Sequence, residues 1–306
     1  MNPELPSVDR LKEAASAMWP ELRLSGFRVN QEGWTNLILE TDQELLFRFP
    51  RWAPAARGLG FEVRVLEYLS SRLSAPLPEP LRIGVLRSPR GWPFISYRRL
   101  PGVPLSTVRE LDLTERRRIR NFLGKLLAEL AALPDARMRR LGCAPGDRDA
   151  WGKRYVELYE QYDRVASHRL PLEIDRRVRS EFDRFLRTLR RSEYRPAISH
   201  LDLGTYNILW DPERGRPTGV LDWEDLRFAD PAFDLTGLRF LGGPLLAPLV
   251  RARKRPGDES FEARLAFYRR ASHVHEICYA IEVGKNALLR KTLRELRLSL
   301  DDAPLG

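Results

Sequence analysis

The chain of 306 residues is 43% hydrophobic and carries 52 Lys and Arg against 42 Asp and Glu, a formal net charge of +10. This length is enough to bury an extensive core and predicts roughly two domains or lobes. The composition argues against a membrane protein, because no basic start is followed by an apolar run and no stretch approaches the roughly 18 uninterrupted apolar residues of a membrane helix. We therefore expect a globular, cytoplasmic protein with no membrane partner.

The excess of basic residues makes nucleic acid the first partner to consider. The arginines, however, are spread along the chain in runs such as residues 114–120 and 173–191, with acidic residues among them. Runs of this kind are more often solvated faces of helices than surfaces that follow a phosphate backbone. No zinc-finger spacing or RNA-recognition signature accompanies them, so we expect no nucleic-acid partner.

Neither a disulfide framework nor a zinc site is expected. The only cysteines, Cys143 and Cys278, lie far apart in the sequence and show no ligand-like spacing. His273 and His275 precede Cys278 closely enough to imitate a metal cluster. They fall within a predicted helix, however, and we do not expect a metal there.

Alternating apolar and polar residues in 27–49 predict a β-hairpin, formed by NLILE, the turn TDQ and ELLFRF. Residues 59–73 then place apolar side chains at helical spacing: Leu59, Val63, Leu66, Leu69 and Leu73. The proline-rich segment 74–80 ends this helix. Two further strands are predicted at 81–86 and 93–97, so a small, mostly β unit with one helix should end near residue 100.

Beyond a connector rich in proline and glycine, the pattern becomes helical. Thr114 is the expected N-cap of a helix whose apolar residues form one stripe: Ile119, Phe122, Leu123, Leu126, Leu127 and Leu130. Helices are also predicted over 149–163, 172–190 and 259–296, and only residues 198–222 interrupt them with strand-like character. Four aromatic residues at helical spacing are expected in the core rather than in a substrate platform: Trp151, Tyr155, Tyr159 and Tyr162.

The segment ISHLDLGTYNILWD, residues 198–211, sets His200, Asp202 and Asn207 within an apolar stretch, where an unpaired buried polar group would cost several kcal/mol. After Asn207 come a strand, the turn DPERGRP and a second strand that ends at Asp222. A hairpin of this length brings Asp222 beside Asn207. Oxygen-bearing side chains that converge near the carboxylate of Asp202 suit Mg²⁺, which favours oxygen ligands.

An H-x-D pattern, an asparagine five residues after the aspartate and a second aspartate on the following hairpin are the catalytic and metal-binding parts of protein kinases. Residues 198–235, ISHLDLGTYNILWDPERGRPTGVLDWEDLRFADPAFDL, resemble the aminoglycoside and macrolide phosphotransferases, antibiotic kinases with a protein-kinase-like fold. This resemblance implies a bilobal α+β protein. Residues 1–98 would form a small antiparallel-sheet lobe that binds nucleotide, and residues 99–306 a larger helical lobe with the catalytic loop, the metal site and the acceptor site.

The segments upstream support the same resemblance. FRFPR followed by FEVRVLEYL resembles the nucleotide strand of that family and the helix behind it, with Glu62 fourteen residues after Arg48 where the family pairs a basic residue with a glutamate. The stretch ISYRRLPGVPL resembles the hinge between the lobes. It would place Tyr97 at the back of the nucleotide pocket and the backbone from Arg98 to Leu100 beside a purine.

The phosphate-covering loop has a weaker signal. The turn from Gln31 to Asn36 is the candidate, although Gly33 is its single glycine and it falls well short of G-x-G-x-x-G.

The resemblance implies a role for each matched residue. Asp202 would orient the acceptor hydroxyl and take its proton, and His200 would brace the catalytic loop by hydrogen bonding. Asn207 and Asp222 would hold Mg²⁺ against the phosphates of ATP or GTP. Arg48 would contact these phosphates and pair with Glu62. The implied reaction is transfer of the γ-phosphate to a hydroxyl of an aminoglycoside- or macrolide-like acceptor.

Structural interpretations of the same residues stay open from the sequence alone. Asp202 could cap a turn and Asn207 could satisfy a loop backbone. An isolated pair of Arg48 and Glu62 would usually be an ordinary surface ion pair.

Four acidic residues follow the hairpin. Asp230 precedes Pro231 and is expected to be an N-cap, and Asp234 is expected to be a first-turn acid, so we assign both a structural role. Glu224 and Asp225 could face the metal, the substrate or solvent.

Two positions depart from the commonest form of the family. Many members carry lysine at the position of Arg48, and a planar guanidinium is not equivalent to a compact ammonium at a phosphate. The small residue often found between the His and the Asp is Leu201 here, which could alter the fit of the loop.

The sequence leaves the acceptor open. Aminoglycosides are polycations that need a carboxylate-rich cleft, whereas this chain is basic overall; local acids that could still line one are Glu224, Asp225, Glu276 and Glu282. Macrolides would tolerate the basic charge better. The alternatives are a kinase of a metabolite such as an amino alcohol, or a catalytically silent nucleotide-binding protein of the same fold.

Overall fold

The computed structural model describes residues 7–30, 35–86, 91–146, 148–191 and 194–301. The start of the candidate phosphate-covering turn, residues 31–34, lies outside these ranges. Proximity of Cα atoms groups the chain into two units. The first comprises Met1–Leu111, Arg140–Gly142 and Tyr206–Asp225, and the second comprises Asp112–Arg139, Cys143–Thr205 and Leu226–Gly306.

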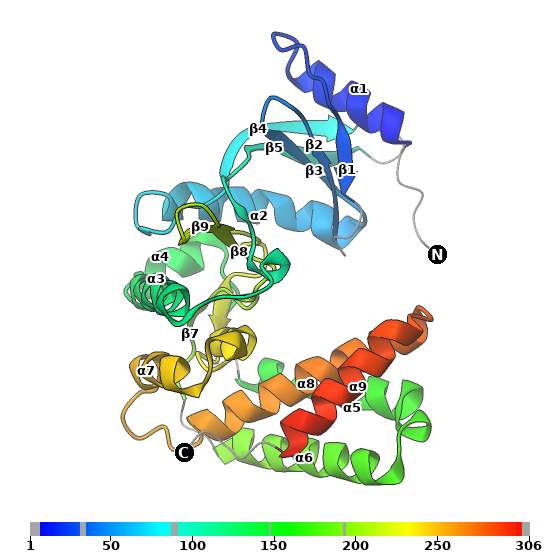
Figure 1. The fold of residues 1–306 in the computed structure, drawn as a ribbon, viewed down its shortest axis with the longest axis vertical. Helices are drawn as coiled ribbons and strands as arrows, with labels where there is room; N and C mark the ends of the chain where they lie inside the picture. The colour runs from blue at the N-terminus through cyan, green and yellow to red at the C-terminus, as the bar shows by residue number, and fades with distance from the viewer. Residues whose placement is uncertain (1–6, 31–34, 87–90, 147, 192–193, 302–306) are drawn as a thin grey trace. The chain divides into compact units, whose positions relative to one another are not determined.

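An antiparallel sheet of five strands forms the centre of the first unit, in the order β1-β2-β3-β5-β4 (Figure 1). Its strands are β1 (Arg28–Asn30), β2 (Asn36–Glu40), β3 (Leu45–Pro50), β4 (Glu79–Leu86) and β5 (Trp92–Arg98). The predicted hairpin is confirmed as β2 and β3, and both later strands are present. Arg48 pairs in register with Ile38 on one side and with Ile95 on the other, so it lies on the central strand.

Helices cover both faces of this sheet, α1 (Val8–Met18) on one and α2 (Ala53–Leu69) on the other (Figure 1). Because side chains alternate along a strand, Phe47 and Phe49 enter the core with Leu11 of α1, whereas Arg48 points to the side of α2. The sequence predicts α2, but at 59–73 rather than Ala53–Leu69, so both of its ends are predicted too late. It does not predict α1, which buries only two residues.

A second, three-stranded sheet of the first unit contains the predicted hairpin. Its order is β6 (Val103–Pro104), β8 (Ile208–Asp211) and β9 (Arg216–Val220). The side chain of Asp211 accepts hydrogen bonds from the backbone N–H of Glu213 and of Arg214, both at 3.0 Å, which closes the turn between β8 and β9. Beyond the last strand pair, Leu221 N–H donates to the carbonyl of Asn207 at 2.8 Å. The hairpin therefore places Asn207 next to the residue that precedes Asp222, as predicted.

The second unit is mainly helical. Its helices are α3 (Leu113–Ala131), α4 (Asp135–Leu141, whose last two residues belong to the first unit), α5 (Arg148–Val165), α6 (Leu172–Arg191), α7 (Gly243–Arg253), α8 (Phe261–Glu282) and α9 (Asn286–Asp301). A two-stranded sheet of β7 (Ala197–Ser199) and β10 (Arg227–Ala229) also belongs to it, as do the 3-10 helices η2 (Ser167–Arg169) and η3 (Phe233–Leu241). None of the helices in the described part of the chain is both long and apolar enough to cross a bilayer.

Two further predictions about helices are wrong. The N-cap of α3 is Asp112 rather than Thr114, because Asp112 and Glu115 form a reciprocal capping box. The single helix predicted over 259–296 is two helices, since Gly284 adopts a φ of 71° and ends α8.

The aromatic residues of α5 lie in the core of the second unit, as predicted. Trp151, Tyr155 and Tyr162 are buried, and Tyr159 is half-buried. The indole of Trp151 donates a hydrogen bond to the hydroxyl of Tyr268 on α8 at 2.9 Å.

A buried charge network holds the start of η3 to α8. Asp230 accepts a hydrogen bond from Ala232 N–H at 3.0 Å, as a cap would, and also contacts Arg264 and the hydroxyl of Tyr268. Arg264 donates from Nη1 and Nη2 to Asp258, at 2.8 Å each. The predicted structural role of Asp230 is therefore correct, but the prediction that it is an N-cap is wrong, because the N-cap of η3 is Ala232. The main partner of Asp230, Arg264, lies 34 residues away.

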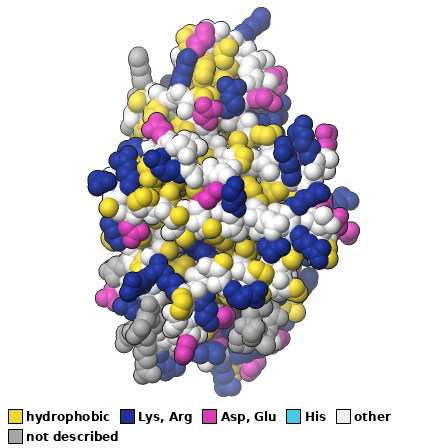
Figure 2. Space-filling view, turned by 90° about the vertical axis from the view of Figure 1, so that its left-hand side faces the viewer, with side chains coloured by type: hydrophobic (Ala, Val, Ile, Leu, Met, Phe, Trp, Pro, Cys, Tyr) yellow, Lys and Arg dark blue, Asp and Glu magenta, His cyan; other side chains and the backbone are white. Residues whose placement is uncertain are grey.

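On the face drawn in Figure 2, the Lys and Arg side chains of the described residues lie in several groups, with acidic and apolar side chains between them. This pattern agrees with the interpretation of the basic runs as solvated helix faces.

We expect replacement of Arg264 by methionine to lower the free energy of unfolding by about 3–5 kcal/mol, because it leaves Asp230 and Asp258 buried without their partner. Urea denaturation followed by circular dichroism measures the change. The matched control is Arg251→Met, an exposed residue on α7, which should stay within about 0.5 kcal/mol of the parent chain. Equal stability of the two variants would contradict the assignment.

Candidate active site

Arg48 is the centre of a buried polar cluster in the first unit. Its Nη1 donates to both carboxylate oxygens of Glu62, at 2.7 and 2.8 Å, and the two side chains are only 11% and 2% exposed. Glu62 reaches Arg48 because it lies on the buried face of α2. Burial opposes the charge of Arg48, but Glu62 and two further carboxylates outweigh it, so the pKa of the guanidinium lies above its usual value. The pair implied by the sequence is thus present, and it is buried rather than an ordinary surface pair.

Two acidic residues from the segment after β9 complete this cluster. Glu224 accepts a hydrogen bond from Nη2 of Arg48, and the Oδ1 atom of Asp222 lies 3.6 Å from the same nitrogen. In the amide orientation of Asn36 that satisfies its neighbours, its oxygen accepts hydrogen bonds from Nη2 and Nε of Arg48, both at 2.8 Å. From the sequence alone, Glu224 could face the metal, the substrate or solvent. In the structure it instead pairs with Arg48 of β3. In the sequence, Asn36 is named only as the end of the candidate phosphate-covering turn, and its contact with Arg48 is not predicted.

The cluster holds more negative than positive charge. Three carboxylates, Glu62, Asp222 and Glu224, surround the single guanidinium of Arg48, which leaves a formal charge of −2 when all are ionised. Burial raises the pKa of each carboxyl, and the nearby Arg48 only partly opposes this. Among the described residues, the buried Oδ1 of Asp222 accepts no hydrogen bond, because its ion pair with Arg48 is too long for one at 3.6 Å. An unsatisfied carboxylate oxygen and an excess of negative charge fit a hard divalent cation such as Mg²⁺.

Asp222 owes its position to an unusual backbone conformation. Its φ is 64°, in the left-handed region that a residue other than glycine seldom adopts. Such a residue costs roughly 1–3 kcal/mol and is found mainly where the surroundings enforce it, often at functional sites. Asn207 precedes β8 and lies next to this turn, because its carbonyl accepts the hydrogen bond from the N–H of Leu221, the residue before Asp222.

The predicted nucleotide residues of β5 and the connector also belong to the first unit. Tyr97 is buried, and burial, followed by the charge of Glu62, raises the pKa of its phenol while Arg48 opposes the shift. Arg98 is exposed and ends β5. Leu100 lies against the hairpin, because a Cβ added to Gly219 would come within 2.8 Å of its Cδ1 atom. The connector therefore packs tightly on β9.

The other two predicted residues, His200 and Asp202, lie in the second unit at the end of β7. His200 is fully buried, and its Nδ1 accepts a hydrogen bond from the backbone N–H of Asp202 at 3.2 Å. Asp202 itself is exposed. Between them, Leu201 adopts a φ of 71°, which explains why a small residue would fit more easily at this position.

A buried ion pair holds this loop from behind. Leu201 N–H donates to Oδ1 of Asp234 at 2.9 Å, and Oδ2 of Asp234 accepts from Nη2 of Arg253 at 3.1 Å. Arg253 also reaches the hydroxyl of Ser199 at 3.3 Å and the carbonyl of Ile198 at 3.4 Å. Asp234 has the structural role that was predicted, as an acidic residue in the first turn of η3, and it also holds the loop. No sequence pattern indicates Arg253, which lies 19 residues further on α7.

We expect Arg253→Met to accelerate hydrogen exchange at the Leu201 amide by more than roughly tenfold, because the acceptor Asp234 loses the partner that holds it. Exchange followed by mass spectrometry, with peptides that overlap residues 198–203, measures the effect. The matched control is Arg264→Met, which breaks a comparable buried pair of the same unit without touching the loop. If exchange at the Leu201 amide accelerates equally in both variants, general destabilisation explains the effect. The claim that Arg253 specifically holds the loop would then be refuted.

Comparison with known proteins identifies the family. The model of the phosphotransferase enzyme family matches residues 26–268. Viomycin phosphotransferase of Streptomyces vinaceus is 25% identical to this chain over 281 residues, which cover 90% of this chain and 94% of that protein.

Solved structures share the fold. The GDP complex of wild-type aminoglycoside 2'-phosphotransferase-IIIa has a TM-score of 0.81 at 18% identity and covers 96% of this chain and 98% of its own. Macrolide 2'-phosphotransferase type I has a TM-score of 0.67 at 20% identity and covers 96% and 98%. These likenesses confirm the predicted α+β, protein-kinase-like fold. The match of the family model over most of the chain, together with this fold, shows that the chain belongs to the phosphotransferase enzyme family.

Proposed function

We propose that this phosphotransferase is a Mg²⁺-dependent small-molecule kinase, which transfers the γ-phosphate of ATP or GTP to a hydroxyl of an aminoglycoside- or macrolide-like acceptor. The observation that supports this most directly is the cluster of three carboxylates around Arg48, with an unsatisfied oxygen on Asp222. A purely structural ion pair would need one carboxylate for one guanidinium. The surplus of acidic groups is what a site for a metal-bound nucleotide requires.

The nucleotide would bind to residues of the N-terminal lobe, residues 1–98, and to the connector that follows it. The backbone from Arg98 to Leu100 would hydrogen bond to the purine, with Tyr97 behind it. Arg48 would contact the phosphates through Nη2, and Glu224 would have to release this nitrogen when it does so. Glu62 would keep the guanidinium in place through Nη1.

Asn207 and Asp222 would hold the Mg²⁺ ion. When bound, this ion supplies charge neutralisation on the phosphate oxygens as the γ-phosphoryl group moves. The left-handed turn at Asp222 aims a carboxylate whose Oδ1 has no protein hydrogen bond among the described residues. Residues 99–306 would also supply the acceptor site.

Asp202 would act on the acceptor. Its carboxylate would accept a hydrogen bond from the attacking hydroxyl and take up its proton as the new oxygen–phosphorus bond forms. The bond from the γ-phosphorus to the β-γ bridging oxygen breaks in the same step, and ADP or GDP leaves. The exposed position of Asp202 leaves the side chain accessible to a substrate. His200 would brace the loop through its hydrogen bond from Asp202 N–H, and the pair of Asp234 and Arg253 would hold the preceding residue.

The proposed acceptor class follows from the names of the relatives, which are viomycin, aminoglycoside and macrolide phosphotransferases. A direct test is nucleotide turnover with each of these compounds and with simple amino alcohols, using ATP and GTP in turn, with and without Mg²⁺. Turnover that requires Mg²⁺ and one of the antibiotics would support the proposal. Turnover with an amino alcohol alone would identify a metabolite kinase instead.

We expect Asp202→Asn to lower kcat by about 10²–10⁴-fold, because the amide cannot accept the proton. The affinity for nucleotide, measured by calorimetry, should change little. The matched control is Asp183→Asn, which neutralises an exposed acid on α6 and should leave kcat unchanged. Equal kcat for the Asp202 variant and the parent chain would remove this residue from the proposed mechanism.

A further inference from the structure

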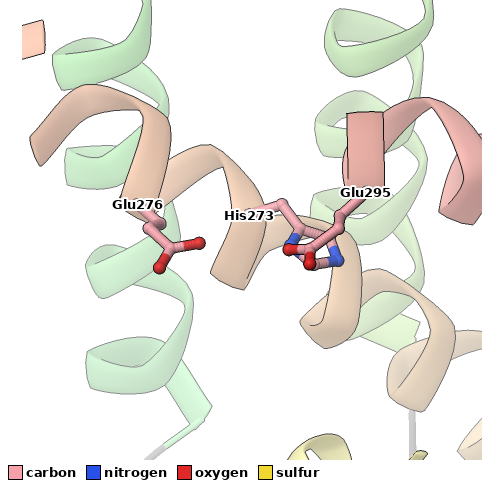
Figure 3. A group of neighbouring side chains, drawn as sticks. All are labelled: His273, Glu276 and Glu295. Carbon is pink, nitrogen blue, oxygen red and sulfur yellow. The ribbon is translucent and has the colours of Figure 1, made fainter. Parts of the chain in front are cut away.

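A second group of metal-binding side chains lies in the helical unit and includes none of the proposed catalytic residues. His273 and Glu276 come from α8, and Glu295 comes from α9 (Figure 3). One ligand atom of each residue lies within 4.8 Å of the other two. His273 and Glu276 share a face of α8 because they are three residues apart. Figure 3 shows Glu295 reaching the same face from the neighbouring helix.

The side chain of Glu276 is held in position. The hydroxyl of Thr292, which is fully buried on α9, donates a hydrogen bond to Oε2 of Glu276 at 2.6 Å. This contact restricts rotation of the carboxylate and leaves Oε1 available to a ligand. Partners of this kind orient metal ligands, and their loss typically weakens binding by about 10–100-fold.

The other two ligands are too far apart for a direct hydrogen bond. Nδ1 of His273 lies 3.9 Å from Oε2 of Glu295. A tetrahedral ion with bonds of about 2.0–2.1 Å would hold its ligand atoms roughly 3.4 Å apart. Small rotations of two side chains would therefore convert the present spacing into a coordination shell.

Burial lowers the pKa of His273, although Glu295 and Glu276 oppose the shift. Two cationic residues also face this histidine, Arg239 of η3 and Lys291 of α9. Lys291 lies 3.9 Å from Glu295, but its side chain is 62% exposed, so this pair is weak and can be displaced.

We propose that His273, Glu276 and Glu295 form a site for a first-row divalent transition-metal ion, with Zn²⁺ as its probe, that joins α8 to α9. An imidazole and two carboxylates suit Zn²⁺, whereas Mg²⁺ favours an all-oxygen shell. Three protein ligands leave a fourth position for water. The proposal does not rest on the kinase reaction, although Glu276 is also one of the acids named in the sequence analysis for an acceptor cleft. It also differs from the grouping considered in the sequence, since neither His275 nor Cys278 belongs to it among the described residues.

The test is isothermal titration of the full chain with ZnCl₂ after dialysis against a chelator, without nucleotide. We expect one site, and we expect His273→Ala and Glu295→Gln each to weaken binding by at least roughly tenfold. The matched control is His275→Ala, an exposed histidine of the same helix, which should bind Zn²⁺ as the parent chain does.

Thermal unfolding provides a second readout that does not depend on the calorimetric signal. Zn²⁺ should raise the Tm of the parent chain and of His275→Ala but not that of His273→Ala, since only a ligand of the folded state stabilises it. Circular dichroism without metal verifies that each variant is folded. Absence of Zn²⁺ binding to the parent chain, or equal binding by His273→Ala and the parent, would overturn the proposal.

Discussion

One guanidinium shared by three carboxylates is the interaction on which the first unit depends. Arg48 links three parts of the chain: β3, on which it lies, α2 through Glu62, and the segment after β9 through Glu224. Buried charges are tolerated only with partners in good geometry, so these parts cannot separate without a large loss of stability. The same contacts leave Asp222 with an unsatisfied oxygen and the cluster with excess negative charge. Structural cohesion and the cation binding that we propose would thus have one origin.

In the second unit, buried ion pairs likewise hold the loop that carries Asp202. Leu201 is held in a left-handed conformation by Asp234, and Asp234 is neutralised by Arg253. A nearby network pairs Asp230 with Arg264. Asp230 and Asp234 therefore each have an arginine from a later helix, Arg264 of α8 and Arg253 of α7. Arginine suits these places because its planar group can serve several acceptors at once while it stays charged.

The sequence predicts the parts whose signals are local. The hairpin of β8 and β9, the pair of Arg48 and Glu62 and most helices follow from periodicity, turn residues and family resemblance. Two of the wrong helix predictions could have been avoided from the sequence. Gly284 marks the break between α8 and α9, and Asp112 with Glu115 forms the spacing of a capping box.

Other features have no local signal. The contact of Glu224 with Arg48 joins residues 176 positions apart, and that of Arg253 with Ser199 joins residues 54 apart. Helix α1 buries only Leu11 and Ala15, so its apolar pattern is too sparse to predict it. The group of His273, Glu276 and Glu295 likewise depends on how two helices pack. Such contacts are set by tertiary packing and become visible only in the folded chain.

The central claim is that the acidic cluster beside Arg48 binds a metal-bound nucleoside triphosphate. Calorimetric titration of the full chain with ATP and with GTP, with Mg²⁺ or with a chelator, tests it most directly when Asp222→Asn is compared with the parent chain. The account predicts that Mg²⁺ strengthens binding to the parent by at least about tenfold and that Asp222→Asn loses most of this gain. Nucleotide affinity that is the same without Mg²⁺, or a full effect of Mg²⁺ in the variant, would contradict it.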